Sequence, residues 1–199
     1  MSSSQLKSLR LVVGLGNPGA EYRETRHNVG AWFVDQLASV YRVDLRLSPK
    51  LFSLLGSLTL QEKQNKLHLM IPSDYMNLSG KAVQAVVNFY KISLDEILIA
   101  HDDLDFSPGI VRLKFGGGHG GHNGLRDIIK ALGSGDFYRL RLGIGHPKDR
   151  GLVADYVLSK PSRSDKVLII DAIDRAVSVF PDMVSGNWDK ATRNLHQEE

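Results

Sequence analysis

The 199-residue sequence contains no cysteine, which excludes a disulfide framework, a thiolate metal site and a cysteine nucleophile. It also lacks any apolar run long enough to cross a bilayer, and its polar amino end has no signal-peptide core, so we expect a cytoplasmic protein with no membrane partner. No GxSxG elbow, HExxH pair or Walker lysine motif is present, which removes the usual serine hydrolase, zinc protease and NTPase interpretations. The formal net charge of +3 is too small to argue for a polyanionic partner.

What the chain does contain is an ordinary globular composition, 42% hydrophobic and 24% charged, in a length that favours one domain with a real core. Strand-like apolar runs alternate with apolar residues at helical spacing, which predicts an α/β fold: a single domain with a twisted, mixed, largely parallel central sheet and helices packed on both faces. We expect residues 1–8 to be frayed and residues 186–199 to form a short terminal helix and tail. The predicted strands span 11–13, 51–60, 66–71, 97–100, 110–115 and 138–144, and the predicted helices span 28–41, 79–90, 125–132, 164–180 and 187–196.

Further predictions concern individual side chains of these elements. Asn28 and Ser79 are predicted to cap the helices that they begin, because short polar side chains are favoured at that position. Phe89 is expected to be buried, and apolar residues recur at helical spacing from Val167 to Val177. Residues 61–65 are predicted to form the turn between two strands.

The stretch 11–30, LVVGLGNPGAEYRETRHNVG, places a histidine and asparagines at the carboxyl end of a predicted strand, the edge where ligands bind in open α/β sheets. Its glycines formally match the dinucleotide fingerprint GxGxxG, but a proline and a charged segment separate the third glycine from the predicted helix, which that fingerprint does not allow. Two other interpretations remain: a glycine turn with a surface histidine, or a catalytic loop with His27 as base and Asn17 as a polar contact.

Other polar residues, among them Asn77, Asp102 and Asn123, also follow predicted strands, so several polar loops meet at one sheet edge and predict a pocket there. The unperturbed pKa of histidine, ~6.5, lets the neutral ring of His27 accept a proton from water near pH 7. A carboxylate such as Asp102, accepting from the second ring nitrogen, would fix the tautomer and stabilise the imidazolium. Asparagine amides offer a donor and an acceptor without charge, which suits a carbonyl or a developing oxyanion.

The same residues permit other interpretations. Asp102, Asp103 and Asp105 are read either as solvated loop carboxylates or as Mg²⁺ ligands, because clustered carboxylates suit a hard cation. His119 and His122 are alternative metal ligands, although the flexible glycine-rich segment GGGHGGHNG around them holds ligands poorly.

Cationic side chains on the predicted strands 110–115 and 138–144 are ambiguous in the same way. Lys114, Arg139 and Arg141 form either a solvated sheet face or a face that holds phosphates. Met76 is more typical of a core residue than of a substrate contact, unless it floors the pocket.

Five segments, taken in order, resemble the bacterial-type peptidyl-tRNA hydrolases over nearly the whole chain. Several matching blocks in order are far more specific than any single motif, and the sequence shows no departure at the functional positions. The segments are VGLGNPGAEYRETRHNVG (13–30), YMNLSGKAV (75–83), HDDLD (101–105), KFGGGHGGHNGLRDI (114–128) and RLRLGIGHP (139–147).

The resemblance implies an enzyme that hydrolyses the ester between a peptide, or an N-blocked aminoacyl group, and the terminal ribose of tRNA. Such an enzyme works as a monomer without a metal or cofactor and releases the tRNA for reuse. Carried over by motif, His27 is the base that activates water, and Asp102 stabilises its working form. Asn17 would separate acylated from free aminoacyl-tRNA, since its uncharged amide can accept from a peptide N–H and offers no countercharge to a free ammonium.

The resemblance also implies which residues bind the substrate. Lys114 and Arg141 look like the family's clamp on the tRNA 5′ phosphate. Two other functions stay open from the residues: a catalytically silent RNA-binding module on the same fold, and a magnesium-dependent nuclease or phosphohydrolase. The residues that would line the site for the aminoacyl ester end are Tyr22, Tyr75, Met76, Asn77 and Asn123.

Overall fold

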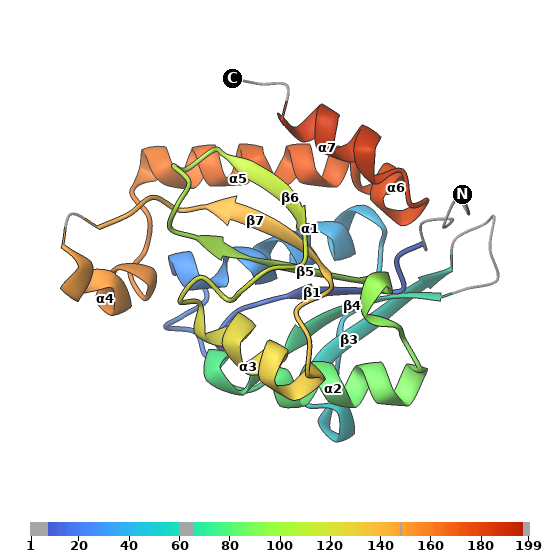
Figure 1. Cartoon of the computed structure of the whole chain (residues 1–199). Coiled ribbons are helices and arrows are strands. Elements are labelled where there is room, and N and C mark those ends of the chain that lie inside the picture. The colour runs from blue at the N-terminus through green and yellow to red at the C-terminus, as the bar shows by residue number, and fades with distance from the viewer. Residues whose placement is uncertain (1–7, 60–65, 148, 197–199) are drawn as a thin grey trace.

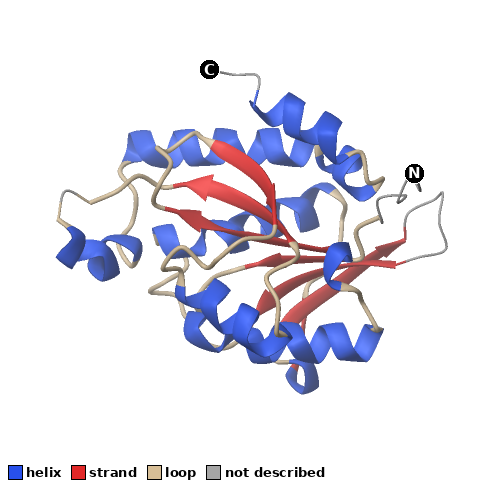
Figure 2. Cartoon of the chain, viewed as in Figure 1, coloured by secondary structure: helices blue, strands red, loops and turns tan. Residues whose placement is uncertain are grey.

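A seven-stranded sheet runs through the middle of the computed structural model, which describes residues 8–59, 66–147 and 149–196 (Figures 1 and 2). Its spatial order is β2-β3-β4-β1-β5-β7-β6. The central pairs β4–β1, β1–β5 and β5–β7 are parallel, and the outer pairs are antiparallel, which confirms the predicted mixed sheet. The strands are β1 Leu11–Gly14, β2 Arg46–Ser48, β3 Ser53–Thr59, β4 Lys66–Pro72, β5 Ile97–Asp103, β6 Val111–Phe115 and β7 Tyr138–Gly143.

Helices cover both faces of this sheet, as the alternation in the sequence predicted (Figure 1). One face carries α1 Val29–Val40 and α5 Arg163–Ser178, with α6 Phe180–Val184 and α7 Trp188–His196 beside them. The other face carries α2 Ser79–Tyr90 and α3 Asn123–Leu132, while α4 Val153–Val157 projects beyond the sheet edge. Short 3-10 helices connect these elements: η1 Arg26–Asn28, η2 Pro49–Leu51, η3 Met76–Leu78, η4 Leu94–Glu96 and η5 Arg150–Leu152.

Strand β5 is buried on both faces, as its uninterrupted apolar run predicted. Leu98 and Ala100 pack toward α1 and α5, whereas Ile97 and Ile99 pack toward α2 and α3. The strand then ends in polar residues at the edge of the sheet where β1 also ends. The apolar residues of β5 therefore belong to the cores on both faces of the sheet, and the polar residues at its carboxyl end are left to form a site.

At Gly30 the main chain of α1 lies directly against the strands. A Cβ atom added at Gly30 would lie 2.2 Å from the carbonyl oxygen of Ala100 and 2.8 Å from the main-chain nitrogen of Leu15. A Cβ atom at Gly14 would lie 2.4 Å from the carbonyl oxygen of Gly30. Only glycine permits this approach, which brings η1, just ahead of α1, to the carboxyl ends of β1 and β5.

Several side-chain expectations were wrong because helix rotation was misjudged. Phe89 is 67% exposed: the buried stripe of α2 runs through Ala82, Val83, Val86 and Val87, and at 3.6 residues per turn Phe89 points away from it. In α5, Val167 and Ile170 are exposed as well. The residues of α5 that face the sheet are Ile169, Ala172, Ile173 and Ala176.

The predicted side-chain caps were also wrong. Asn28 is the last residue of η1 and Ser79 directly follows η3, and the carbonyl groups of these 3-10 helices already accept the first N–H groups of α1 and α2. The Ser79 hydroxyl instead donates to the carbonyl oxygen of Met76 at 2.8 Å, and the Asn28 amide bonds the main chain of Asn17. The predicted turn at 61–65 and nearly all of the predicted frayed segment 1–8 lie outside the described residues. No helix within the described ranges has the length and apolarity to cross a membrane.

Candidate active site

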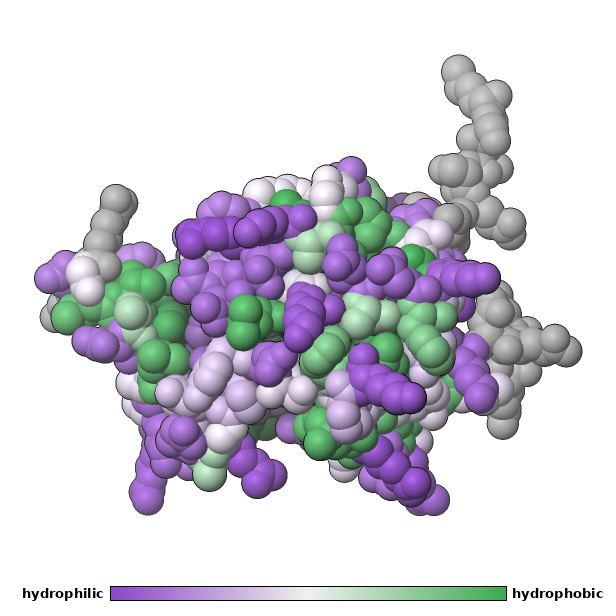
Figure 3. Space-filling model, turned by 90° about the horizontal axis from the view of Figure 1, so that it is seen from below, coloured by the Kyte–Doolittle hydropathy of each residue, from purple (hydrophilic) through white to green (hydrophobic). Residues whose placement is uncertain are grey.

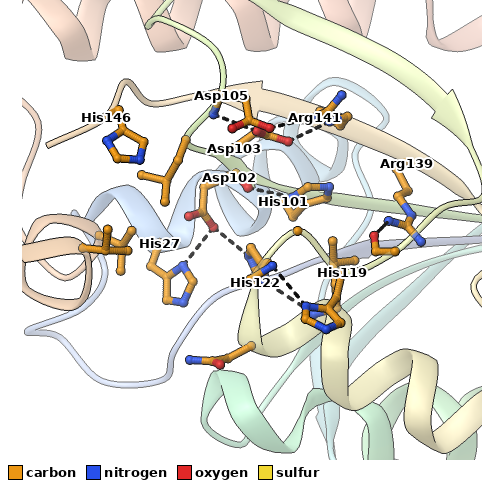
Figure 4. Close-up of a pocket in the computed structure, with 18 of the residues that line it drawn as sticks. His27, His101, Asp102, Asp103, Asp105, His119, His122, Arg139, Arg141 and His146 are labelled. Carbon is orange, nitrogen blue, oxygen red and sulfur yellow. Dashed lines mark hydrogen bonds and ion pairs between the residues drawn. The ribbon is translucent and has the colours of Figure 1, made fainter. Parts of the chain in front are cut away.

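His27 lies in η1 and faces Asp102, near the carboxyl end of β5 (Figure 4). Nδ1 of His27 lies 2.9 Å from Oδ1 of Asp102, and both residues are buried. Because Nδ1 faces a carboxylate, it carries the ring proton, and Nε2 keeps the lone pair that a base needs. Burial alone would lower the pKa of His27, but the charge of Asp102 and its hydrogen bond outweigh burial and raise that pKa above 6.5.

A second histidine, His122, reaches the same carboxylate oxygen. Its Nδ1 accepts from the backbone N–H groups of Gly124 and Leu125, at 3.1 and 3.3 Å, and so caps the N-terminus of α3. An acceptor nitrogen carries no proton, so the proton of this ring is on Nε2, which lies 2.9 Å from Oδ1 of Asp102. The two rings lie close together, with centroids 4.9 Å apart for His27 and His122.

The two histidines determine the ionisation of Asp102. Burial raises the pKa of this carboxyl group, but the charges and hydrogen bonds of His27 and His122 together hold that pKa well below its usual range. Asp102 is therefore a carboxylate at every pH at which the enzyme would act. From the sequence, His122 was considered only as a metal ligand; its place three residues before the predicted helix 125–132 could have suggested a helix cap, but not the contact with Asp102.

The metal sites considered from the sequence do not form. Asp103 turns away from Asp102 and accepts from Nε of Arg141 at 2.7 Å, and Nδ1 of His119 accepts from a backbone N–H of its own loop at 3.0 Å. Within the part of the chain that the structure describes, the one group with metal-ligand spacing is His27, Asp102 and His122. Both ring nitrogens that face Asp102 are protonated donors in this arrangement, so the group is a hydrogen-bonded set, not a ligand set.

Asn17 is held in one orientation by its neighbours. Its main chain is paired with the Asn28 amide through two bonds of 2.9 Å, and its own Oδ1 accepts from the backbone N–H of Met76 at 2.8 Å. Its Nδ2 has no partner among the described residues. Met76 is buried, and a Cβ atom added at Gly124 would lie 2.6 Å from its Sδ. Because Gly124 has no side chain, η3 and the start of α3 can pack together.

The other predicted substrate residues lie at two places. Asn123 begins α3 and lines the same cavity as His27, with its Oδ1 accepting from Arg126 at 3.1 Å. Asn77 is exposed on η3. The rings of Tyr22 and Tyr75 meet edge to face, with centroids 6.3 Å apart. The tyrosines therefore belong to the η3 side, along with Asn17, and not to the cavity lining.

The cavity itself has a volume of about 1040 Å³. His27, Asp102 and Asn123 lie on it, and α4 supplies apolar wall residues that include Val153 and Val157. The volume of the cavity is at the upper end of the range for small-molecule sites, which suits a ligand larger than one amino acid.

Cationic side chains from β6 and β7 line the far part of the cavity. Lys114 and Arg139 are cross-strand partners, and Arg141 shares their sheet face because it lies two residues further along β7. Arg139 is buried and donates to the carbonyl oxygens of Gly117 and Gly118, so its reading as a solvated side chain was wrong. Arg139 holds the glycine loop, which leaves Lys114 and Arg141 as the other cations of β6 and β7 that line the cavity.

Comparison with known proteins assigns the family. The family model described as peptidyl-tRNA hydrolase matches residues 11–199. The peptidyl-tRNA hydrolase of Pseudomonas syringae pv. syringae is 50% identical over 195 residues, covering 98% of this chain and 100% of that protein, and the one of Pectobacterium carotovorum subsp. carotovorum is 53% identical over 192 residues, covering 96% and 97%. The crystal structure of peptidyl-tRNA hydrolase from Acinetobacter baumannii is 44% identical, with a TM-score of 0.91 and 97% of each chain covered. The chain therefore belongs to the peptidyl-tRNA hydrolase family and is a hydrolase that acts on peptidyl-tRNA.

Proposed function

We propose that His27 is the general base of this hydrolase and that Asp102 orients it. The observation that carries the proposal is the 2.9 Å contact between Nδ1 of His27 and Oδ1 of Asp102, which leaves Nε2 free to take a proton. A base positioned in this way typically contributes ~10²–10⁴-fold to the rate of such a reaction.

The reaction then follows in two steps. Nε2 of His27 takes a proton from water as the water oxygen bonds to the ester carbonyl carbon, which gives a tetrahedral oxyanion and an imidazolium. The oxyanion collapses, the bond to the ribose oxygen breaks, and the imidazolium returns the proton to that oxygen. Amide donors such as those of Asn77 and Asn123 would stabilise the oxyanion, and one well-placed donor contributes ~3 kcal/mol.

Asp102 keeps the imidazolium stable between these steps. Its charge is fixed because two histidines donate to it, and its hydrogen bond to Nδ1 holds the ring of His27 in the working tautomer. His122 donates through its Nε2 to the same carboxylate oxygen, since its Nδ1 is occupied by the N–H groups at the start of α3.

Asn17 would select for an acylated α-amino group by donating a hydrogen bond. Its Oδ1 is occupied by the N–H of Met76, so the amide group left for the substrate is Nδ2. A donor at that position bonds the acyl carbonyl oxygen of a peptidyl end, whereas a free ammonium offers only donors and a positive charge. This reverses the direction of the hydrogen bond expected from the sequence and keeps the proposed role.

The tRNA would be held by its phosphates. Lys114 and Arg141 share one face of β6 and β7, beside the cavity that holds His27, and are placed to receive the 5′ phosphate. Phosphate contacts supply affinity without reading sequence, which suits an enzyme that must accept many tRNAs. The protein would act as a monomer, without metal or cofactor, in the cytoplasm, where translation produces its substrate.

The test is release of the acyl group from N-acetyl-aminoacyl-tRNA by the His27→Ala variant. We expect turnover to be lost while tRNA binding is kept, and His119→Ala, a histidine of the same cavity without a contact to Asp102, to remain active. Turnover retained by His27→Ala would remove the base assignment, and loss of wild-type turnover in a chelator would favour the magnesium-dependent alternative.

A further inference from the structure

The chain between β7 and α5 forms one wall of the active-site cavity. It leaves the sheet after Gly143, forms η5 and α4, and rejoins the body of the protein at Arg163 (Figure 1). Val153 and Val157 of α4 line the cavity together with His27. Apolar side chains gather at this end of the molecule in the space-filling view (Figure 3). Whatever holds α4 in place therefore controls how closely the cavity is covered.

Arg26, the residue directly before His27, makes the most extensive contact with this segment. Nη1 of Arg26 lies 2.8 Å from the Ser159 hydroxyl and 2.8 Å from the Lys160 carbonyl oxygen. The guanidinium carbon lies 4.2 Å from the centroid of the Tyr156 ring, and the backbone N–H of Arg26 donates to the Ser159 carbonyl oxygen at 3.1 Å. Nη2 lies 3.4 Å from Oδ2 of Asp165. One buried side chain thus contacts four residues that belong to α4 or follow it.

Other contacts between the same segments are weaker or lie elsewhere. Glu24 pairs with Lys160 at 2.7 Å and with Lys166 at 3.0 Å, but all three side chains are exposed, and exposed ion pairs contribute little. The Tyr156 hydroxyl donates to the Ile144 carbonyl oxygen at 2.7 Å, which ties α4 to the end of β7 and not to η1. Among the described residues, Arg26 is the buried link between α4 and the turn that carries the base.

We propose that Arg26 is a positioning residue for hydrolysis, which clamps α4 against η1 so that the cavity closes over the ester at His27. The inference rests on the assignment of His27 as the base. Its physical basis is that the planar guanidinium satisfies several fixed acceptors and stacks on Tyr156 at once, which fixes the α4 main chain relative to η1. Lys114 and Arg141 come from other elements, so the clamp acts on turnover and not on tRNA affinity.

The first test replaces Arg26 by lysine, which keeps the charge and gives up the planar fork. Because misplacing a reacting group by 1 Å costs up to ~10²-fold, we expect Arg26→Lys to lower kcat about 10²-fold. We expect KM and the affinity for free tRNA to change less than about twofold, the pattern of an interaction made for the transition state. Amide exchange should quicken in residues 153–159 and not across the sheet. The matched control is Glu24→Gln, which breaks the exposed pairs between the same segments and should keep kcat within about twofold.

The second test approaches the clamp from α4, in case Arg26→Lys does not fold. Tyr156→Leu removes both the stacking face and the hydroxyl bond to Ile144, and should lower kcat with little change in KM. Tyr156→Phe removes the hydroxyl bond alone and keeps the stacking face, so it is the matched control and should keep kcat. The double variant should be no slower than the slower single variant, because both substitutions break one contact. Losses that multiply, or wild-type kcat in a folded Arg26→Lys or Tyr156→Leu variant while His27→Ala is inactive, would overturn the clamp. Activity of His27→Ala would instead overturn the base assignment.

Discussion

His27 and His68 are both buried histidines, but they lie at opposite ends of the sheet. His27 faces the Asp102 carboxylate at the carboxyl ends of the parallel strands. His68 lies on β4 beside Leu11, near the amino end of β1, with its Nδ1 2.8 Å from the Ser57 hydroxyl and its ring stacked on Tyr90 at 3.8 Å. The two sites therefore differ in partner and not in burial.

Because the partners differ, the pKa values of His27 and His68 are shifted in opposite directions. Burial and the nearby charges of Arg10 and Lys66 together lower the pKa of His68 to about 4, with burial as the largest cause. Burial also acts on His27, but there the carboxylate of Asp102 reverses the outcome and raises the pKa. A buried histidine is thus a structural aromatic ring unless a carboxylate makes its protonated form accessible, which is what a general base requires.

The largest effect is expected when the partner of His27 is made neutral, which removes the feature that distinguishes it from His68. Asp102→Asn should lower kcat by about 10²–10⁴-fold, because the imidazolium loses its counter-charge and the ring loses its fixed tautomer. Single-turnover cleavage of N-acetyl-aminoacyl-tRNA measures the effect. Asp103→Asn is the matched control, since Asp103 pairs with Arg141 and not with His27, and should leave the cleavage step intact. Equal losses in both variants would mean that position 102 has no special role.

A smaller substitution sharpens the comparison by leaving Asp102 in place. His122→Asn keeps a side chain that can cap α3 but removes the second donor to Asp102. The carboxylate then acts on His27 alone, so the pKa of His27 rises further and the acid limb of the kcat profile moves to higher pH. On the acid limb, below the pKa of His27, we expect one unit of such a shift to lower kcat by about tenfold, with recovery at higher pH.

His119→Asn is the control for that experiment, because His119 contacts the glycine loop and not Asp102. Its pH profile should match the wild type. A His122→Asn profile that drops equally at every pH would show that His122 acts only as a helix cap.

The smallest expected effect concerns stability at the other end of the sheet. The pKa of His68 is lower in the folded protein than the unfolded value of 6.5, so the unfolded chain takes up the proton first, and stability falls as pH drops from 6.5 to about 4. At 1.36 kcal/mol per pKa unit this amounts to about 3 kcal/mol. His27 has the opposite sign, because its raised pKa contributes stability below pH 6.5 that disappears as pH rises through that pKa.

Urea denaturation between pH 7 and 4 tests this. His68→Phe keeps an aromatic ring against Tyr90 and leaves an exposed serine hydroxyl free to turn to water, so it should lose less stability on acidification than the wild type. Parallel curves for the two proteins would contradict the assignment of the acid sensitivity to His68.

The order of the longer strands and helices was predictable because apolar spacing is a local property of the sequence, whereas the short elements β2, α4 and α6 were not predicted. The positions of Asn123 and Asp102 at one edge followed from that order. Contacts that depend on the packed structure were not predictable. Nothing local to His122 indicates that its ring reaches Asp102, and nothing near Arg26 indicates that its acceptors lie beyond residue 158. The sequence left Arg139 open between a solvated and a phosphate-binding side chain for the same reason, since a strand pattern reports which face a side chain takes but not what covers that face.

The separation between the base and its acid is set by the main chain. Gly30 follows His27 by three residues, and Ala100 precedes Asp102 by two. The main chains of Gly30 and Ala100 are in contact, since a Cβ atom added at Gly30 would lie 2.2 Å from the Ala100 carbonyl oxygen. A methyl group added at position 30 would push α1 off the sheet and lengthen the path between imidazole and carboxylate, even though it lies outside the cavity. Substitutions at this contact would therefore lower the catalytic rate from outside the cavity, even though every polar side chain of the site is still present.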